Sequence, residues 1–266
     1  MAKVRFLKLK EPHVMDQALI VPRVAFVINI ASGDSPRISP PRLRHLVHLF
    51  RSHRIHATWA LEDARIAALL QEQSAELSAD HVALSLRALE SDPSLAAREF
   101  GGKLTAKMNS LASSLSEPPG AVLSSGSALR SRLPLLSDWG IHTVIRSSQV
   151  GSTGSRPRAL ACGLWQVTPS INLPRRSIWQ RLVRRGPSVR ELSAAAVDDT
   201  VVVGVNSTDF GKQSARHIQS FEKFLREASW GASRGQIELC SVAEIVAGLR
   251  ERHQVRPQQS ILKVAA

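Results

Sequence analysis

Residues 41–61 read PRLRHLVHLFRSHRIHATWAL and contain the change of pattern that decides the fold. In the first half, apolar residues recur at the spacing of one helix face, at Leu43, Leu46, Val47 and Phe50. From residue 55 to residue 61 the pattern becomes a short apolar run with a Thr and a Trp, which is typical of a buried strand. An amphipathic helix that leads directly into a buried strand predicts an α/β protein.

The same alternation continues on both sides of this stretch. Short β-rich runs predict strands at residues 23–30, 55–61, 80–86, 121–124, 141–145, 160–167, 200–205 and 236–240. Helical patterns lie between them, at residues 62–73, 92–115, 127–137 and 212–228, and after Ser241, which has capping-box spacing to Glu244. Gly101-Gly102 is a point at which the long helix from Asp92-Pro93 can be interrupted. The alternation predicts a parallel sheet, either open and doubly wound or closed into a barrel.

Length and composition indicate one globular domain. The chain has 266 residues, 43% of them hydrophobic, and neither a repeat nor a change of composition divides it. We expect the domain at residues 22–252, an N-terminal extension at 1–21 and a C-terminal tail at 253–266. Two cysteines are too few for a disulfide framework. With no long apolar run and no signal-peptide pattern, we expect a cytoplasmic protein without a membrane span.

The charge is strongly basic, with 35 Lys and Arg against 22 Asp and Glu and a formal net charge of +13. Its densest cluster is the basic patch Arg175, Arg176, Arg181, Arg184 and Arg185 around a tryptophan. Such a patch can bind phosphates and stack on a base, so nucleic acid is a partner to consider. On a helix these arginines would also form an ordinary solvated face, which is the interpretation we favour.

Motifs of common enzyme classes are missing from the sequence. The first strand is followed by a single glycine, Gly33, which disfavours a dinucleotide-binding turn, and no P-loop or Gly-x-Ser-x-Gly motif occurs. Among nine histidines, His81 is the one placed at a strand where barrel chemistry could gather. Polar residues follow several predicted strands and would form a rim at the carboxyl edge of the sheet, at Asn29, 32–34, Glu62, Asp63, 85–90, Ser124, Ser125 and 206–209.

Several segments, taken in order, resemble the polysaccharide deacetylase family, which has the NodB-homology domain. Residues 41–61 resemble the family's helix followed by a Gly-(Val/Ile)-x-Ala-Thr-(Phe/Trp) strand. Residues 81–86, 136–141 and 163–169 are similar to its later strand motifs, and 202–245 to its closing strand, helix and strand. The resemblance implies a distorted (β/α) barrel of about seven strands and a role in carbohydrate metabolism.

The family's metal-binding and catalytic residues are replaced in this chain. Ala31 and Ser32 stand where the family has paired aspartates, and Asp34 lies two residues further on. Leu86 and Glu90 fall at its two metal-binding histidines, and Asn206 falls near its late histidine. A metal that activates water needs several anionic or imidazole ligands. We therefore expect no metal or other cofactor, and a pseudoenzyme.

Three hypotheses remain open. The first is a non-catalytic deacetylase-like protein that binds a glycan, a sugar nucleotide or a partner enzyme, with ligand contacts at Trp59, Ser125, Trp165 and Asn206. The second is an active hydrolase of the amide bond in N-acetylated sugars, with displaced groups at Asp34, His81, Glu90 and Asp209. The third is a basic nucleic-acid or surface-binding module, which we do not favour.

Overall fold

The computed structural model describes residues 21–30, 39–73, 78, 81–90, 92, 95–115, 117–125, 129, 132–147, 156–173, 189–196, 199–207 and 215–255. In these residues one curved sheet has the strand order β6-β7-β5-β4-β3-β2-β1-β9-β8, with β10 beside β1. The strands are β1 Arg23–Ile30, β2 Ala57–Leu61, β3 Val82–Ser85, β4 Ala121–Ser124, β5 Thr143–Arg146, β6 Arg158–Ala159, β7 Trp165–Val167, β8 Ile171–Leu173, β9 Thr200–Asn206 and β10 Glu238–Leu239. Only β6 pairs antiparallel, so the predicted α/β fold with a parallel sheet is confirmed.

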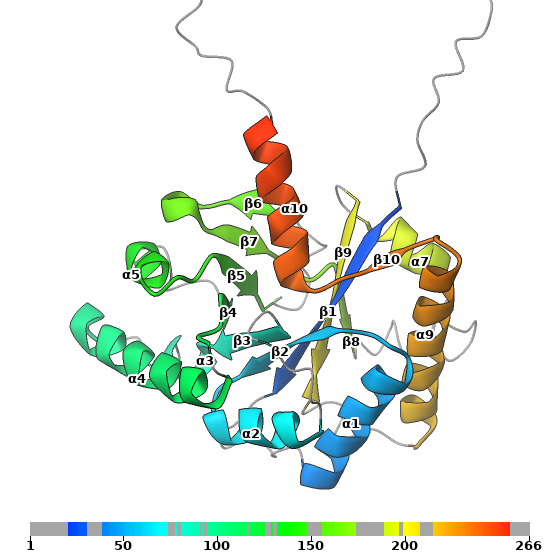
Figure 1. Cartoon of the computed structure of the whole chain (residues 1–266), viewed down its shortest axis with the longest axis horizontal. Coiled ribbons are helices and arrows are strands. Elements are labelled where there is room, and N and C mark those ends of the chain that lie inside the picture. The colour runs from blue at the N-terminus through cyan, green and yellow to red at the C-terminus, as the bar shows by residue number, and fades with distance from the viewer. Residues whose placement is uncertain are drawn as a thin grey trace, which may run out of the picture.

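Helices surround the outside of this sheet, as Figure 1 shows for α1, α2, α4, α5 and α9. Their bounds are α1 Pro40–Ser52, α2 Ala64–Gln73, α3 Arg87–Glu90, α4 Ala97–Leu115, α5 Leu133–Asp138, α7 Val189–Ala194, α9 Ala215–Ser233 and α10 Val242–Val255. Helix α4 runs through Gly101-Gly102 without a break, because its buried stripe from Phe100 to Leu115 holds it against the sheet. None of the helices described is long and apolar enough to cross a membrane.

Strand alternation separates two apolar layers. On the outer face, Phe26 and Trp59 pack with Phe50 of α1, at ring-centroid distances of 5.5 and 5.8 Å from it. On the inner face the side chains are smaller, and Ala60 and Ala83 are fully buried there. Small side chains leave room on the concave side of a curved sheet, and α10 occupies part of it. The seven neighbouring parallel strands from β7 to β9 thus form a half-barrel, in agreement with the predicted distorted barrel.

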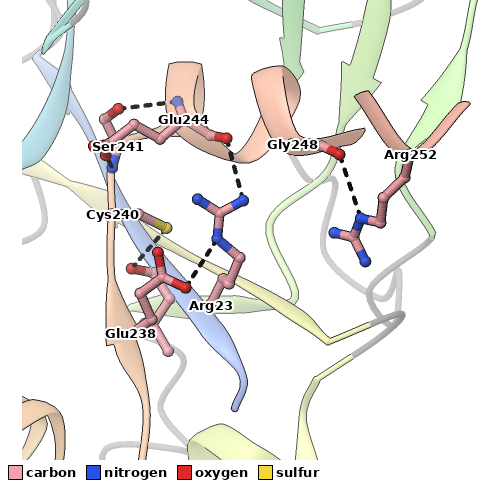
Figure 2. Close-up of polar contacts among 8 residues, drawn as sticks. Arg23, Glu238, Cys240, Ser241, Glu244, Gly248 and Arg252 are labelled. Atoms are coloured by element: carbon pink, nitrogen blue, oxygen red, sulfur yellow. Dashed lines mark hydrogen bonds and ion pairs between the residues drawn. The ribbon is translucent and has the colours of Figure 1, made fainter. Parts of the chain in front are cut away.

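Helix α10 is fixed to the amino end of β1 by polar contacts (Figure 2). The Arg23 guanidinium lies 3.3 Å from the Glu238 carboxylate and donates to the Glu244 carbonyl at 3.2 Å. The predicted capping box is present, because the Glu244 amide donates to Ser241 Oγ at 3.1 Å and the Ser241 amide donates to the Glu244 carboxylate at 2.6 Å. The helix therefore closes the inner face from the amino-terminal side.

Candidate functional site

Polar residues lie where five neighbouring strands end, and we call this region the mouth. Strand alternation places three of them, Asn29, Ser85 and Asn206, on the inner face. Asn29 continues the inner-facing series of Ala25 and Val27, and Ser85 follows Ala83 in the same way. The mouth comprises Asn29, Glu62, Ser85, Glu90, Ser124, Ser125, Asn206 and Ser207. These residues lie at the strand ends at which the sequence predicted a polar rim, whereas Leu86, within the predicted range 85–90, belongs to the apolar core.

Glu62 directly follows β2 and is buried, with 7% of its surface exposed. The Ser85 hydroxyl donates to its carboxylate at 3.4 Å, and its backbone carbonyl accepts from the Lys107 ammonium at 2.8 Å. Lys107 comes from α4, so this contact links an outer helix to the end of β2. The Glu62 carboxylate is thus a buried acceptor that the Ser85 hydroxyl contacts at the mouth.

Glu90 ends α3 and is enclosed by the end of β4. Its carboxylate accepts from the Ser125 amide and the Ser125 hydroxyl at 2.6 Å each, and from the Ser124 hydroxyl. Ser124 is 1% exposed, so this contact is internal. We call Glu90, Ser124 and Ser125 the serine clasp. A carboxylate with three donors on its two oxygens has little capacity left for a metal ion.

Two buried polar atoms of the mouth have no hydrogen-bond partner among the residues that the structure describes. They are Asn29 Oδ1, at the next-to-last residue of β1, and Ser207 Oγ, directly after β9. The two strands are neighbours, with Asn29 beside Asn206 in the register, and Ser207 is fully buried. Buried polar atoms are normally satisfied by protein, water or ligand. Asn29, which has the inner-facing parity, therefore marks the part of the mouth best suited to a polar ligand.

The residues at the mouth do not fit the metal that the family resemblance implies. Leu86, which stands at one histidine position, is fully buried in the outer apolar layer. Glu90, at the other, belongs to the serine clasp. In the described part of the chain, no three His, Cys, Asp or Glu side chains come together to hold a metal ion.

The other predicted site residues are placed apart from the mouth. His81 precedes β3, whereas Glu90 follows it, and the four-residue strand between them is about 13 Å long. Trp59 is 6% exposed and packs edge-on against Phe50 in the outer layer. Trp165 begins β7 and packs edge-on against His253 of α10, with ring centroids 5.8 Å apart. Of the predicted ligand-binding residues, Ser125 and Asn206 alone lie at the mouth.

Several predicted residues lie outside the residues that the structure describes. They are Ala31, Ser32, Asp34 and Asp209, together with the basic patch Arg175, Arg176, Arg181, Arg184 and Arg185. Their proposed roles stay predictions. Sequence reasoning did not identify the serine clasp, because Glu90 meets serines that are 34 and 35 residues away along the chain.

Comparison with known proteins agrees with this architecture. Neither a family model nor a curated protein matches the chain. Among solved structures, a protein assigned to the polysaccharide deacetylases from Mycobacterium smegmatis matches with a TM-score of 0.59 at 14% identity, over 87% of this chain and 91% of that one. Puue allantoinase matches with a TM-score of 0.58 at 10% identity, over the same shares of the two chains.

A pseudoenzyme of the CE4 family from Bacillus anthracis matches with a TM-score of 0.51 at 12% identity, over 85% of this chain and 66% of that one. At these identities the likeness concerns the fold alone. The chain has the NodB-like fold of the polysaccharide deacetylases, as the order of its sequence motifs predicted.

Proposed function

We propose that the chain is a non-catalytic, polysaccharide deacetylase-like protein that binds a carbohydrate at the mouth. The observation that carries this proposal is that residues 86 and 90 are both engaged in the structure and not available to a metal ion. Leu86 is packed in the core and Glu90 is held by the serine clasp, so both act as structural residues. Water activation by a metal would require both positions to supply ligands.

The remaining polar groups of the mouth suit neutral hydroxyl and amide groups. Asn29 and Asn206 offer side-chain amides, which both donate and accept hydrogen bonds. Asn29 Oδ1, which has no hydrogen-bond partner among the described residues, would gain a hydrogen bond from a sugar hydroxyl or an N-acetyl group. Polysaccharide deacetylases share the fold, which makes an N-acetylated sugar the first ligand class to test.

The test combines calorimetric titration with chitooligosaccharides and measurement of acetate release and metal content. We expect binding without acetate release and close to zero transition metal per chain. Asn29→Ala should weaken binding about tenfold, the equivalent of one hydrogen bond to a buried group. The exposed Asn109 of α4 supplies the matched control, since Asn109→Ala changes the same side chain far from the mouth.

Opposite results would identify the active hydrolase instead. Acetate release with about one metal ion per chain, lost in Asp34→Asn or Glu90→Gln, would overturn the non-catalytic proposal. Absence of binding to any N-acetylated sugar would overturn the ligand class.

A further inference from the structure

A cavity of about 370 Å³ opens at the opposite end of the sheet, where it is lined by residues of α1, α2 and the start of β2. Its floor is apolar and includes Val47, Ile55, Trp59 and Leu70. Its basic lining consists of Arg51, Arg54, His56 and His81. We call this the basic cavity. A volume of this size suits a small-molecule ligand, and an apolar floor with a few convergent polar groups is typical of such sites.

Arg54 occupies an unfavourable backbone position at the rim of this cavity. It follows α1 with φ of 54°, the left-handed region in which glycine is usual. Its amide donates to the Arg51 carbonyl and the Ile55 amide donates to the Phe50 carbonyl, each at 3.0 Å, which is the Schellman pattern of a helix end. A strained arginine at a cavity rim indicates a role for its guanidinium.

Two imidazoles complete the basic lining, His56 from the same connection as Arg54 and His81 from the residue just before β3. The rings of His56 and His81 are stacked, with centroids 5.3 Å apart and planes at 19°. Ser78 Oγ lies 2.9 Å from His81 Nδ1, which fixes that ring. Glu244 of α10 interacts with the His81 charge, but its carboxylate already accepts from the Ser241 amide. Three N–H-bearing side chains from two segments of the chain thus line one cavity.

We propose that the basic cavity binds a phosphate-bearing small molecule whose planar apolar part lies on the floor formed with Trp59, as a nucleoside monophosphate would. A phosphate presents three oxygens, which match the separate donors on Arg54, His56 and His81. The apolar floor next to these donors accounts for a second, uncharged part of the ligand. This site is distinct from the carbohydrate-binding mouth and does not depend on it.

Arg54→Gly is the decisive variant, because it removes the guanidinium while giving the helix end its preferred residue. The full chain is titrated by calorimetry with adenosine monophosphate, inorganic phosphate and adenosine. We expect the monophosphate to bind about tenfold more tightly than inorganic phosphate, and Arg54→Gly to weaken it about tenfold or more. The melting temperature of Arg54→Gly should equal or exceed that of the wild type. Arg98→Ala, an exposed arginine on α4 with the same change of charge, should bind as the wild type does.

Each other result overturns a part of the proposal. Equal affinities of Arg54→Gly and Arg98→Ala would show that the cavity is not the site. Adenosine binding as tight as the monophosphate would remove the role of the phosphate, and inorganic phosphate binding equally tightly would remove the role of the floor. His56→Gln provides a second variant, and it should lower the affinity for the monophosphate without a loss of folding.

Discussion

The two ends of the sheet differ in how their polar groups are used. At the mouth, carboxylates and serines bond to one another, as Glu90 does in the serine clasp. At the amino end, cationic side chains line the basic cavity, and α10 closes the inner face nearby. The chain has the fold of the polysaccharide deacetylases, and the polar groups at its two ends differ in chemistry. A shared scaffold therefore indicates where a site can form but leaves its chemistry to the individual side chains.

Leu86 tests whether the position of one metal-binding histidine of the family is filled by core packing. Leu86→Ala removes a fully buried side chain and should lower the free energy of unfolding by about 2–5 kcal/mol, measured by denaturant unfolding. The partly exposed Leu69 of α2 provides the control, and Leu69→Ala should change stability by less than about 0.5 kcal/mol. A small loss at Leu86 would mean that this position is open, as a ligand position would be.

Glu90 tests whether the serine clasp is structural. Glu90→Ala leaves the donors of Ser124 and Ser125 without their acceptor and should cost about 1–3 kcal/mol of unfolding free energy. Glu90→Gln keeps one acceptor oxygen and should cost less. If both variants unfold like the wild type at equilibrium, the clasp does not stabilise the mouth.

The fold could be predicted because its signals are local. The helix stripe at residues 43–50 and the apolar strand after it are readable within one window, and both form as predicted. The capping box at Ser241 was predictable for the same reason. The long helix shows the limit of local signals, because its apolar stripe outweighs Gly101-Gly102 through contacts that the sequence does not display.

The sites were predictable only in part. Strand alternation placed Asn29 and Asn206 correctly at the carboxyl ends, because neighbouring parallel strands end together. It could not pair Glu90 with Ser124, nor stack His56 on His81, since these contacts depend on the three-dimensional spacing of separate segments. The basic cavity was not predicted, because the left-handed backbone of Arg54 is visible only in the structure.

His53 makes stability at the amino end sensitive to acid. Burial lowers the pKa of this histidine from its usual 6.5, Glu222 opposes the shift and Arg226 adds to it. Its Nε2 is buried and lacks a hydrogen-bond partner among the described residues. The unfolded chain therefore binds a proton more readily, so stability is fully present above pH 6.5 and decreases as the pH falls towards the lower folded-state pKa.

We expect His53→Asn to reduce the fall in unfolding free energy between about pH 7 and pH 5, measured by denaturant titrations at several pH values. The exposed His48 of α1 serves as the control, and His48→Asn should leave the pH dependence as in the wild type. An unchanged slope in His53→Asn would assign the acid sensitivity to another group.

The two cysteines provide the smallest and most direct test of how tightly α10 closes the inner face. Cys162 is exposed, whereas Cys240 is 4% exposed, and burial raises the pKa of the Cys240 thiol to about 12. The negative charges of Glu238 and Glu244 act in the same direction, and Arg23 opposes them.

Because the thiolate is the reactive form, an aromatic disulfide reagent at pH 8 should modify one thiol promptly in the native protein. Cys162→Ser should abolish that phase, and guanidinium should release the second thiol. Prompt reaction of both thiols in the native protein would mean that α10 leaves the sheet readily, and the amino end would then be open rather than closed.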